Sequence, residues 1–97
     1  MTELSIKSSY PLAETKFVLH EFLRHQMNFI NSRYSKFLKE CESFEEKFNM
    51  SSETFLEKFK SGELGDDEQW FDWFASYRGR DAWRMKYNIL QDISWNE

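Results

Sequence analysis

The feature that most constrains this chain is a run from Leu12 to Phe48 that contains neither glycine nor proline. Within it, apolar residues recur at alternating spacings of four and three, which is the heptad period of a helix that lies along another helix. The residues of this seam are Leu23, Met27, Ile30, Tyr34, Phe37, Cys41, Phe44 and Phe48. Because aromatic side chains and a cysteine make poor layers of a two-stranded leucine zipper, the seam predicts a helical hairpin or bundle.

The rest of the composition also favours helices. The chain of 97 residues has three glycines and one proline, too few turn formers for a sandwich or barrel of short strands. A chain of this length is one domain. We therefore expect a single all-α domain over residues 1–97, in which one long N-terminal helix packs against two or three shorter helices and residues 1–9 are loose.

Local signals place the shorter helices. Ser51 or Ser52 is a good N-cap for a second helix, and Gly62 suits the end of that helix. Asp66 is expected to cap a third helix. Gly79 is expected to kink or end the third helix, with Asp81 capping a fourth.

The expected helix lengths favour an oligomer. A helix of about 37 residues is roughly 55 Å long at about 1.5 Å per residue, longer than a compact domain of this size. Later helices of about 9, 12 and 13 residues would cover only part of it. We therefore expect a homodimer or a heteromeric pair, with the seam residues Met27, Ile30, Tyr34, Phe37, Cys41 and Phe44 at the contact.

The charge distribution excludes some functions. The net charge is −4, and the whole imbalance lies after residue 50, where ten acids face six bases. A protein that grips phosphates usually has a basic excess, so direct nucleic-acid binding is disfavoured. No apolar stretch approaches the roughly 20 residues of a membrane span, and the single Cys41 cannot form an internal disulfide. We expect a cytoplasmic protein that does not enter membranes.

Residues suited to catalysis are not arranged for it. His20 and His25 are five residues apart, whereas a zinc site on one helix face needs two histidines four apart. No nucleophile–base pair or glycine-rich phosphate loop is present, so we expect no enzyme, no cofactor and no small-molecule substrate. Two alternatives remain open for the acidic segment 63–72. One is a metal-dependent enzyme or metal sensor that uses Asp66, Asp67 and Glu68 with the two histidines, and the other is a mimic of nucleic-acid phosphates.

Tryptophan and arginine dominate the energetic centres of protein interfaces. Four tryptophans within the last 28 residues are more than a small domain can easily bury. We therefore predict that the protein binds a protein partner through the side chains of Trp70, Trp73, Arg78, Arg80 and Trp83.

Residues 55–75 contain the pattern F-x-x-G-E-L-G-D-D-x-x-W-F-x-W, with Gly62-Glu63-Leu64-Gly65-Asp66-Asp67 as its most specific part. This segment resembles one found in small helical prokaryotic proteins that are described as antitoxin-type components and are encoded beside a toxin-like partner. The resemblance covers about a fifth of the chain and implies a partner-binding protein. The chain departs from many antitoxins because it has no recognisable DNA-binding N-terminal domain, so repression of its own gene is not implied.

Overall fold

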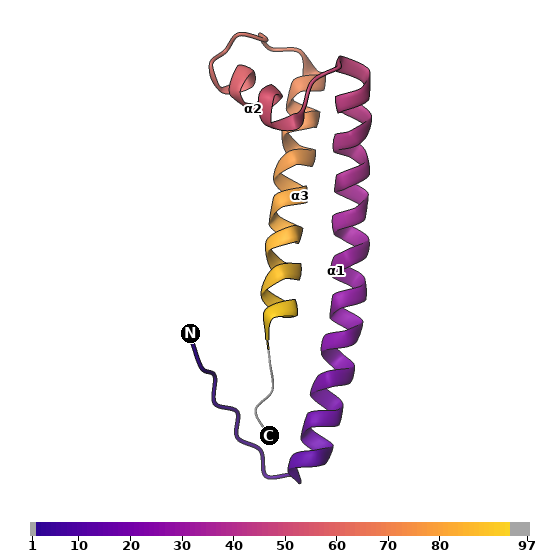
Figure 1. The fold of residues 1–97 in the computed structure, drawn as a ribbon, viewed down its shortest axis with the longest axis vertical. Helices are drawn as coiled ribbons and strands as arrows, with labels where there is room; N and C mark the ends of the chain where they lie inside the picture. Colours follow the sequence, from indigo (N-terminus) through magenta and orange to yellow (C-terminus); the bar gives the residue numbers. More distant parts are fainter. Residues whose placement is uncertain (1, 94–97) are drawn as a thin grey trace.

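The computed structural model describes residues 2–93, which form a long helical hairpin with a short helix across one end (Figure 1). Three helices follow one another: α1 (Leu12–Phe48), α2 (Ser52–Lys60) and α3 (Glu68–Asp92). α3 runs antiparallel beside α1, and α2 lies where α1 gives way to α3 (Figure 1). Residues 2–93 contain no β-strand, and the predicted all-α fold, with a long first helix packed against shorter ones, is confirmed.

α1 is continuous over its 37 residues. Pro11 occupies the N-cap, where its missing N–H is no loss, and its carbonyl accepts the first helical hydrogen bond from the Thr15 amide at 3.0 Å. The helix ends at Asn49, whose left-handed φ of 51° turns the chain out of the helix. The chain therefore has a long axis, and its principal extents are 59 × 24 × 17 Å.

α2 and the loop after it follow their local signals. The hydroxyl of Ser51 accepts from the Thr54 amide at 3.1 Å, as an N-cap should. Gly62 and Gly65 have φ of 78° and 81°, a region in which residues with a side chain are strained. The two glycines thus let the chain turn twice in a short space between α2 and α3.

α3 differs from the prediction in two ways. Its N-cap is Asp67, whose carboxylate accepts from the Gln69 amide at 2.9 Å, one residue later than the predicted cap at Asp66. It also runs unbroken through Gly79 for 25 residues, so the predicted third and fourth helices are one helix. The reason for the glycine is close packing, because a Cβ at this position would lie 2.7 Å from the ring of Phe37 on α1.

The length of α3 also determines what covers the seam of α1 within the chain. Because α3 is a single helix, it covers much of α1 within the same chain. Ile30 and Cys41 are 6% and 1% exposed, and Phe37 packs against Gly79 of α3. The middle of the seam, at Ile30, Phe37 and Cys41, is therefore packed against α3 of the same chain.

Candidate protein-binding surface

The closed end of the hairpin, where α2 joins α1 and α3, contains the aromatic core. The Trp73 ring stacks on Phe55 of α2 with centroids 4.1 Å apart and planes at 5°, and on Phe44 of α1 at 5.5 Å. Trp73 and Phe55 are both 0% exposed. One tryptophan is thus held between rings from two other helices, an arrangement that joins all three elements.

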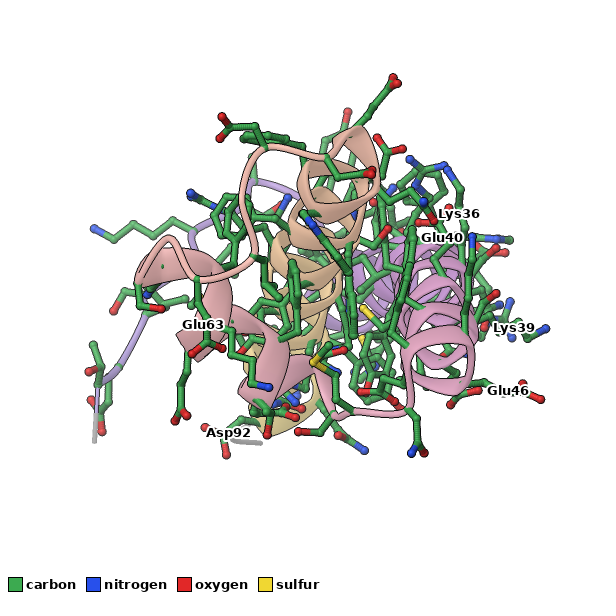
Figure 2. All side chains as sticks on the ribbon, turned by 90° about the horizontal axis from the view of Figure 1, so that it is seen from above. Lys36, Lys39, Glu40, Glu46, Glu63 and Asp92 are labelled. Atoms are coloured by element: carbon green, nitrogen blue, oxygen red, sulfur yellow. The ribbon has the colours of Figure 1, made fainter. Side chains whose placement is uncertain are left out.

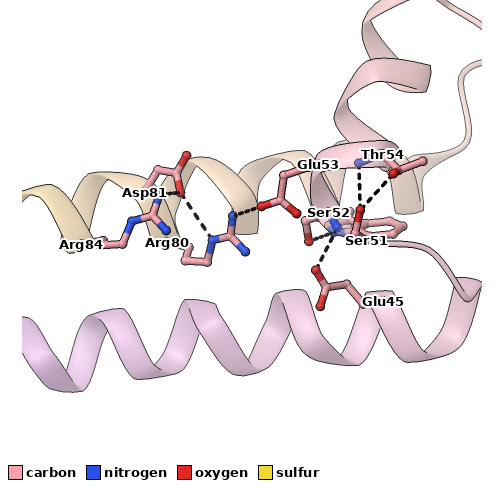
Figure 3. Close-up of polar contacts among 9 residues, drawn as sticks. Glu45, Ser51, Ser52, Glu53, Thr54, Arg80, Asp81 and Arg84 are labelled. Atoms are coloured by element: carbon pink, nitrogen blue, oxygen red, sulfur yellow. Dashed lines mark hydrogen bonds and ion pairs between the residues drawn. The ribbon is translucent and has the colours of Figure 1, made fainter.

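Polar groups of this core are hydrogen-bonded in a chain. The indole N–H of Trp73 donates to the Ser52 hydroxyl at 3.0 Å, and the Ser52 amide donates to the carboxylate of Glu45 at 2.8 Å (Figure 3). A buried indole or hydroxyl without a partner would cost stability. These bonds therefore fix α2 against both long helices.

Arg80 is an internal residue of the hairpin, and it is 7% exposed. Its guanidinium donates to Glu53 of α2 at 3.1 Å and to the neighbouring Asp81 at 3.4 Å (Figure 3). Its charge also lies 4.7 Å from the ring centroid of Tyr77. Arg80 thus ties α3 to the first turn of α2.

Two titratable groups near Arg80 are perturbed. The pKa of Glu53 is lowered, first by a hydrogen bond from its own backbone N–H and then by the hydrogen bond from Arg80. Burial raises the pKa of the Cys41 thiol, so this cysteine is protonated and inert near neutral pH. Both pKa shifts arise from packing and hydrogen bonds that hold the helices together, so they indicate a structural role for Glu53 and Cys41.

The five predicted partner-binding residues therefore divide into three groups. Trp73 and Arg80 lie inside the chain, and they are corrected to core residues because α1 and α2 cover them. The Trp70 indole is half-buried and donates to the Leu64 carbonyl at 3.1 Å, which pins the loop before α3. Arg78 is exposed and Trp83 is partly exposed, so both are accessible to another protein.

A second face of α3 carries exposed apolar side chains. Met85 and Ile89 are 63% and 57% exposed, and Ile93 is 40% exposed. Met85 follows Trp83, whose ring meets Phe29 of α1, by two residues or about 200° of helix rotation, so Met85 faces away from that contact. Arg78 precedes Met85 by seven residues and shares this side. We call these four residues the outer face of α3: Arg78, Met85, Ile89 and, directly after the last residue of the helix, Ile93.

The lower half of α1 is apolar on its surface as well. Over half of each of four side chains is exposed in its first three turns. These side chains are Leu12, Phe17, Val18 and Phe22. Exposed apolar residues scattered singly are normal, but a concentration at one end of a small protein is a sign of a contact surface. This open end of the hairpin thus contrasts with the packed closed end.

A strip of cations and aromatic rings runs along one flank of the hairpin, between α1 and α3. Phe29 meets Trp83 edge-on with centroids 5.7 Å apart, and both Arg33 and Lys86 lie over Trp83, at 5.9 and 4.4 Å from its ring centroid. Lys36 lies 5.1 Å from the Phe37 centroid on the same flank. We call this set the cation–aromatic strip: Phe29, Arg33, Lys36, Trp83 and Lys86.

The sequence analysis missed this strip. Its residues come from two helices, and on each helix they form no sequence motif that predicts a binding site. The one available signal was that Arg33 follows Phe29 by four residues and Lys86 follows Trp83 by three, so that each cation shares a helix side with a ring.

The alternative of a metal site has no cluster of ligands to support it. In the part of the chain that the structure describes, no group of three or more His, Cys, Asp and Glu side chains is placed to hold a metal ion. Asp67 is used as the α3 cap, and Glu63 lies 3.9 Å from the ammonium of Lys58. His20 and His25 lie on the lower half of α1, whereas segment 63–72 is at the closed end (Figure 1).

Comparisons with known proteins give no family. No protein-family profile matches the chain, and no curated protein and no solved structure matches it either. None of the helices within residues 2–93 is both long enough and apolar enough to cross a bilayer. The function is therefore argued from the surface itself.

Proposed function

We propose that this protein is a non-catalytic binding protein that occupies a partner protein in the manner of an antitoxin-type component and works as a homodimer. The observation that carries the proposal is the outer face of α3, where Met85 and Ile89 are more than half exposed on a well-formed helix. A regular helix with apolar side chains on its solvent side fits the groove or helix surface of another protein. Arg78 on the same face adds a residue type common at interface centres.

The segment that resembles antitoxin-type proteins supports this proposal through the fold. In this chain it supplies the α2–α3 turn with Gly62 and Gly65, the cap at Asp67 and the buried rings of Phe55 and Trp73. Its residues thus build the closed end, which holds α3 in place. We propose that a protein sharing this segment shares the hairpin, and that α3 then presents the partner-binding face.

The test is a purification of the tagged protein from its native host, in parallel with two double variants. Met85→Glu with Ile89→Lys places opposite charges on the outer face of α3 without changing the net charge. Lys39→Glu with Glu46→Lys is the matched control, because both side chains are exposed on the side of α1 away from α3 (Figure 2). Circular dichroism establishes that all three proteins are equally helical.

The proposal requires a stoichiometric second protein with the wild type and with the control, and its loss with Met85→Glu/Ile89→Lys. Retention of the same partner by that variant would show that α3's outer face is not the binding surface. Recovery of the wild type with no second protein would remove the partner-binding function altogether.

A further inference from the structure

We propose that a second copy of this chain docks on the flank that carries the cation–aromatic strip, antiparallel to the first, about a two-fold axis at the level of Gly79. The inference rests on the homodimer of the proposed function and gives that dimer a surface. It leaves the outer face of α3 to a different partner. In this contact, positively charged side chains of each copy would face negatively charged side chains of the other.

The strip supplies the positive half of the contact. Arg33, Lys36 and Lys86 are each placed over an aromatic ring, and within residues 2–93 none of them is paired with a carboxylate. In a chain of net charge −4, three unpaired cations on one flank are a local excess of positive charge. Such an excess attracts an acidic surface and is strongest where water is excluded.

The same flank supplies the negative half. Asp72 precedes Lys86 by two heptads, so the two exposed side chains lie on the same side of α3, about 21 Å apart at about 1.5 Å per residue. On α1, Glu40 follows Lys36 by one helical turn, and the two lie together on one side of the helix (Figure 2). The Ser76 hydroxyl donates to Glu40 at 2.9 Å, which orients that carboxylate on the flank beside α3.

These two charge pairs have the same centre. The midpoint between Asp72 and Lys86 is Gly79, and the midpoint between Lys36 and Glu40 is one residue from Phe37. Gly79 and Phe37 are in contact, since a Cβ on the glycine would lie 2.7 Å from the ring. An antiparallel two-fold axis at this level therefore places Lys86 opposite Asp72 of the second copy and Lys36 opposite Glu40 of the second copy.

A second copy fits this flank better than nucleic acid does. Phosphates would bind the strip but would meet Asp72 and the acidic residues at the start of α3 further along the same flank. A two-fold contact requires a patch that complements itself, and a flank with acid at one end and base at the other satisfies that requirement.

The experiment is a charge exchange between two variants of the full chain. Lys86→Glu and Asp72→Lys are each measured alone and then mixed in equal amounts, by sedimentation velocity at low and at high salt. Each variant alone sets like charges against one another at both symmetric positions, and we expect its dimer dissociation constant to rise about tenfold or more. In the mixture each variant offers the charge that the other lacks, so a dimer of twice 11.9 kDa is expected to return to within about threefold of the wild-type affinity.

Several outcomes would overturn the inference. These are a wild type that stays monomeric at every concentration, single variants that dimerise as well as the wild type, and a mixture no tighter than its components. Binding of a duplex or single-stranded oligonucleotide that Lys86→Glu abolishes would instead assign the strip to nucleic acid. Because the purification described above tests Met85 and Ile89, the partner and the dimer can fail independently.

Discussion

The two ends of this hairpin are built from the same kinds of residue and use them in opposite ways. At the closed end, rings from all three helices stack on Trp73, which is completely buried. At the open end, Phe17 and Phe22 of α1 and Met85 and Ile89 of α3 are each more than half exposed. Apolar content is therefore similar at both ends, but only one end has a third helix to cover it.

The difference shows where the stability of the chain originates. α2 is only 9 residues long, yet it supplies a buried ring, a hydrogen-bond acceptor for the Trp73 indole and a carboxylate for Arg80. Within residues 2–93, the open end is formed by the two long helices, and no third helix lies across it. We infer that the closed end folds the protein and that the open end is left for contact with other molecules.

The largest expected effect is at the centre of the closed end. Trp73→Ala removes the ring that joins three helices and is expected to lower the free energy of unfolding by about 3–5 kcal/mol. Because so large a loss can leave the chain unfolded, Trp73→Phe is the second variant. It keeps a ring but removes the N–H bonded to Ser52, at an expected cost of about 1–3 kcal/mol. Urea denaturation measures both, and a loss below about 0.5 kcal/mol for either would contradict the central role of Trp73.

The next effect tests the closest approach of α1 and α3. Alanine in a helix interior normally stabilises by up to about 1 kcal/mol over glycine. Here the new Cβ would lie 2.7 Å from the Phe37 ring, so Gly79→Ala is expected to destabilise by about 1–3 kcal/mol. In a Phe37→Leu background the same change is expected to reverse sign, because the ring is gone. A stabilising Gly79→Ala in the wild-type background would show that the two helices can separate at no cost.

Gly79 also shows what sequence reasoning can and cannot reach. α1 and α2 were predicted with their ends because caps, glycines and heptad spacing are local signals. From the local sequence, a glycine inside a helical pattern predicts a helix end or a kink. In the structure, Gly79 instead leaves room for the ring of Phe37 to pack against the α3 backbone. The need for a residue without a side chain at position 79 arises from tertiary packing, and the residues next to Gly79 in the sequence do not indicate it.

The burial of two of the predicted partner-binding residues has a related reason. Trp73 and Arg80 were assigned to a surface because tryptophan and arginine are frequent in interfaces. Yet Trp73 and Arg80 are seven residues apart, so they share a heptad position on α3, and both are buried in the structure. The spacing could have placed them inside. It could not have supplied Glu53, the carboxylate from another helix that makes a buried Arg80 tolerable.

A smaller effect concerns the ion pair between α2 and α3. The pKa of Glu53 in the folded chain is lower than its ordinary value of 4.5. As the pH falls below about 4.5, Glu53 is protonated in the unfolded chain before it is protonated in the folded chain. The free energy of unfolding therefore decreases with falling pH until the pH is below the pKa that Glu53 has in the folded chain. Glu53→Gln is expected to cost below about 1 kcal/mol at neutral pH, since the carboxylate is largely exposed. The same variant should lose less free energy of unfolding than the wild type between pH 5 and pH 3, as measured by denaturation at both pH values. If the wild type and Glu53→Gln lose the same amount over this range, Glu53 does not contribute to the acid sensitivity.

The smallest effect on stability is expected for Ile89 on the outer face of α3, and Ile30, which is buried between α1 and α3, provides the matched comparison. Ile30 is 6% exposed and Ile89 is 57% exposed. Ile30→Ala leaves a cavity between α1 and α3 and should cost about 2–4 kcal/mol. Ile89→Ala removes atoms that are mostly in water, so its cost should stay within about 0.5 kcal/mol. The measurement is urea denaturation of dilute protein, and its result decides what the exposed face is. If Ile89→Ala costs as much as Ile30→Ala, this face is already covered in the protein alone, and no binding surface remains on the outer side of α3.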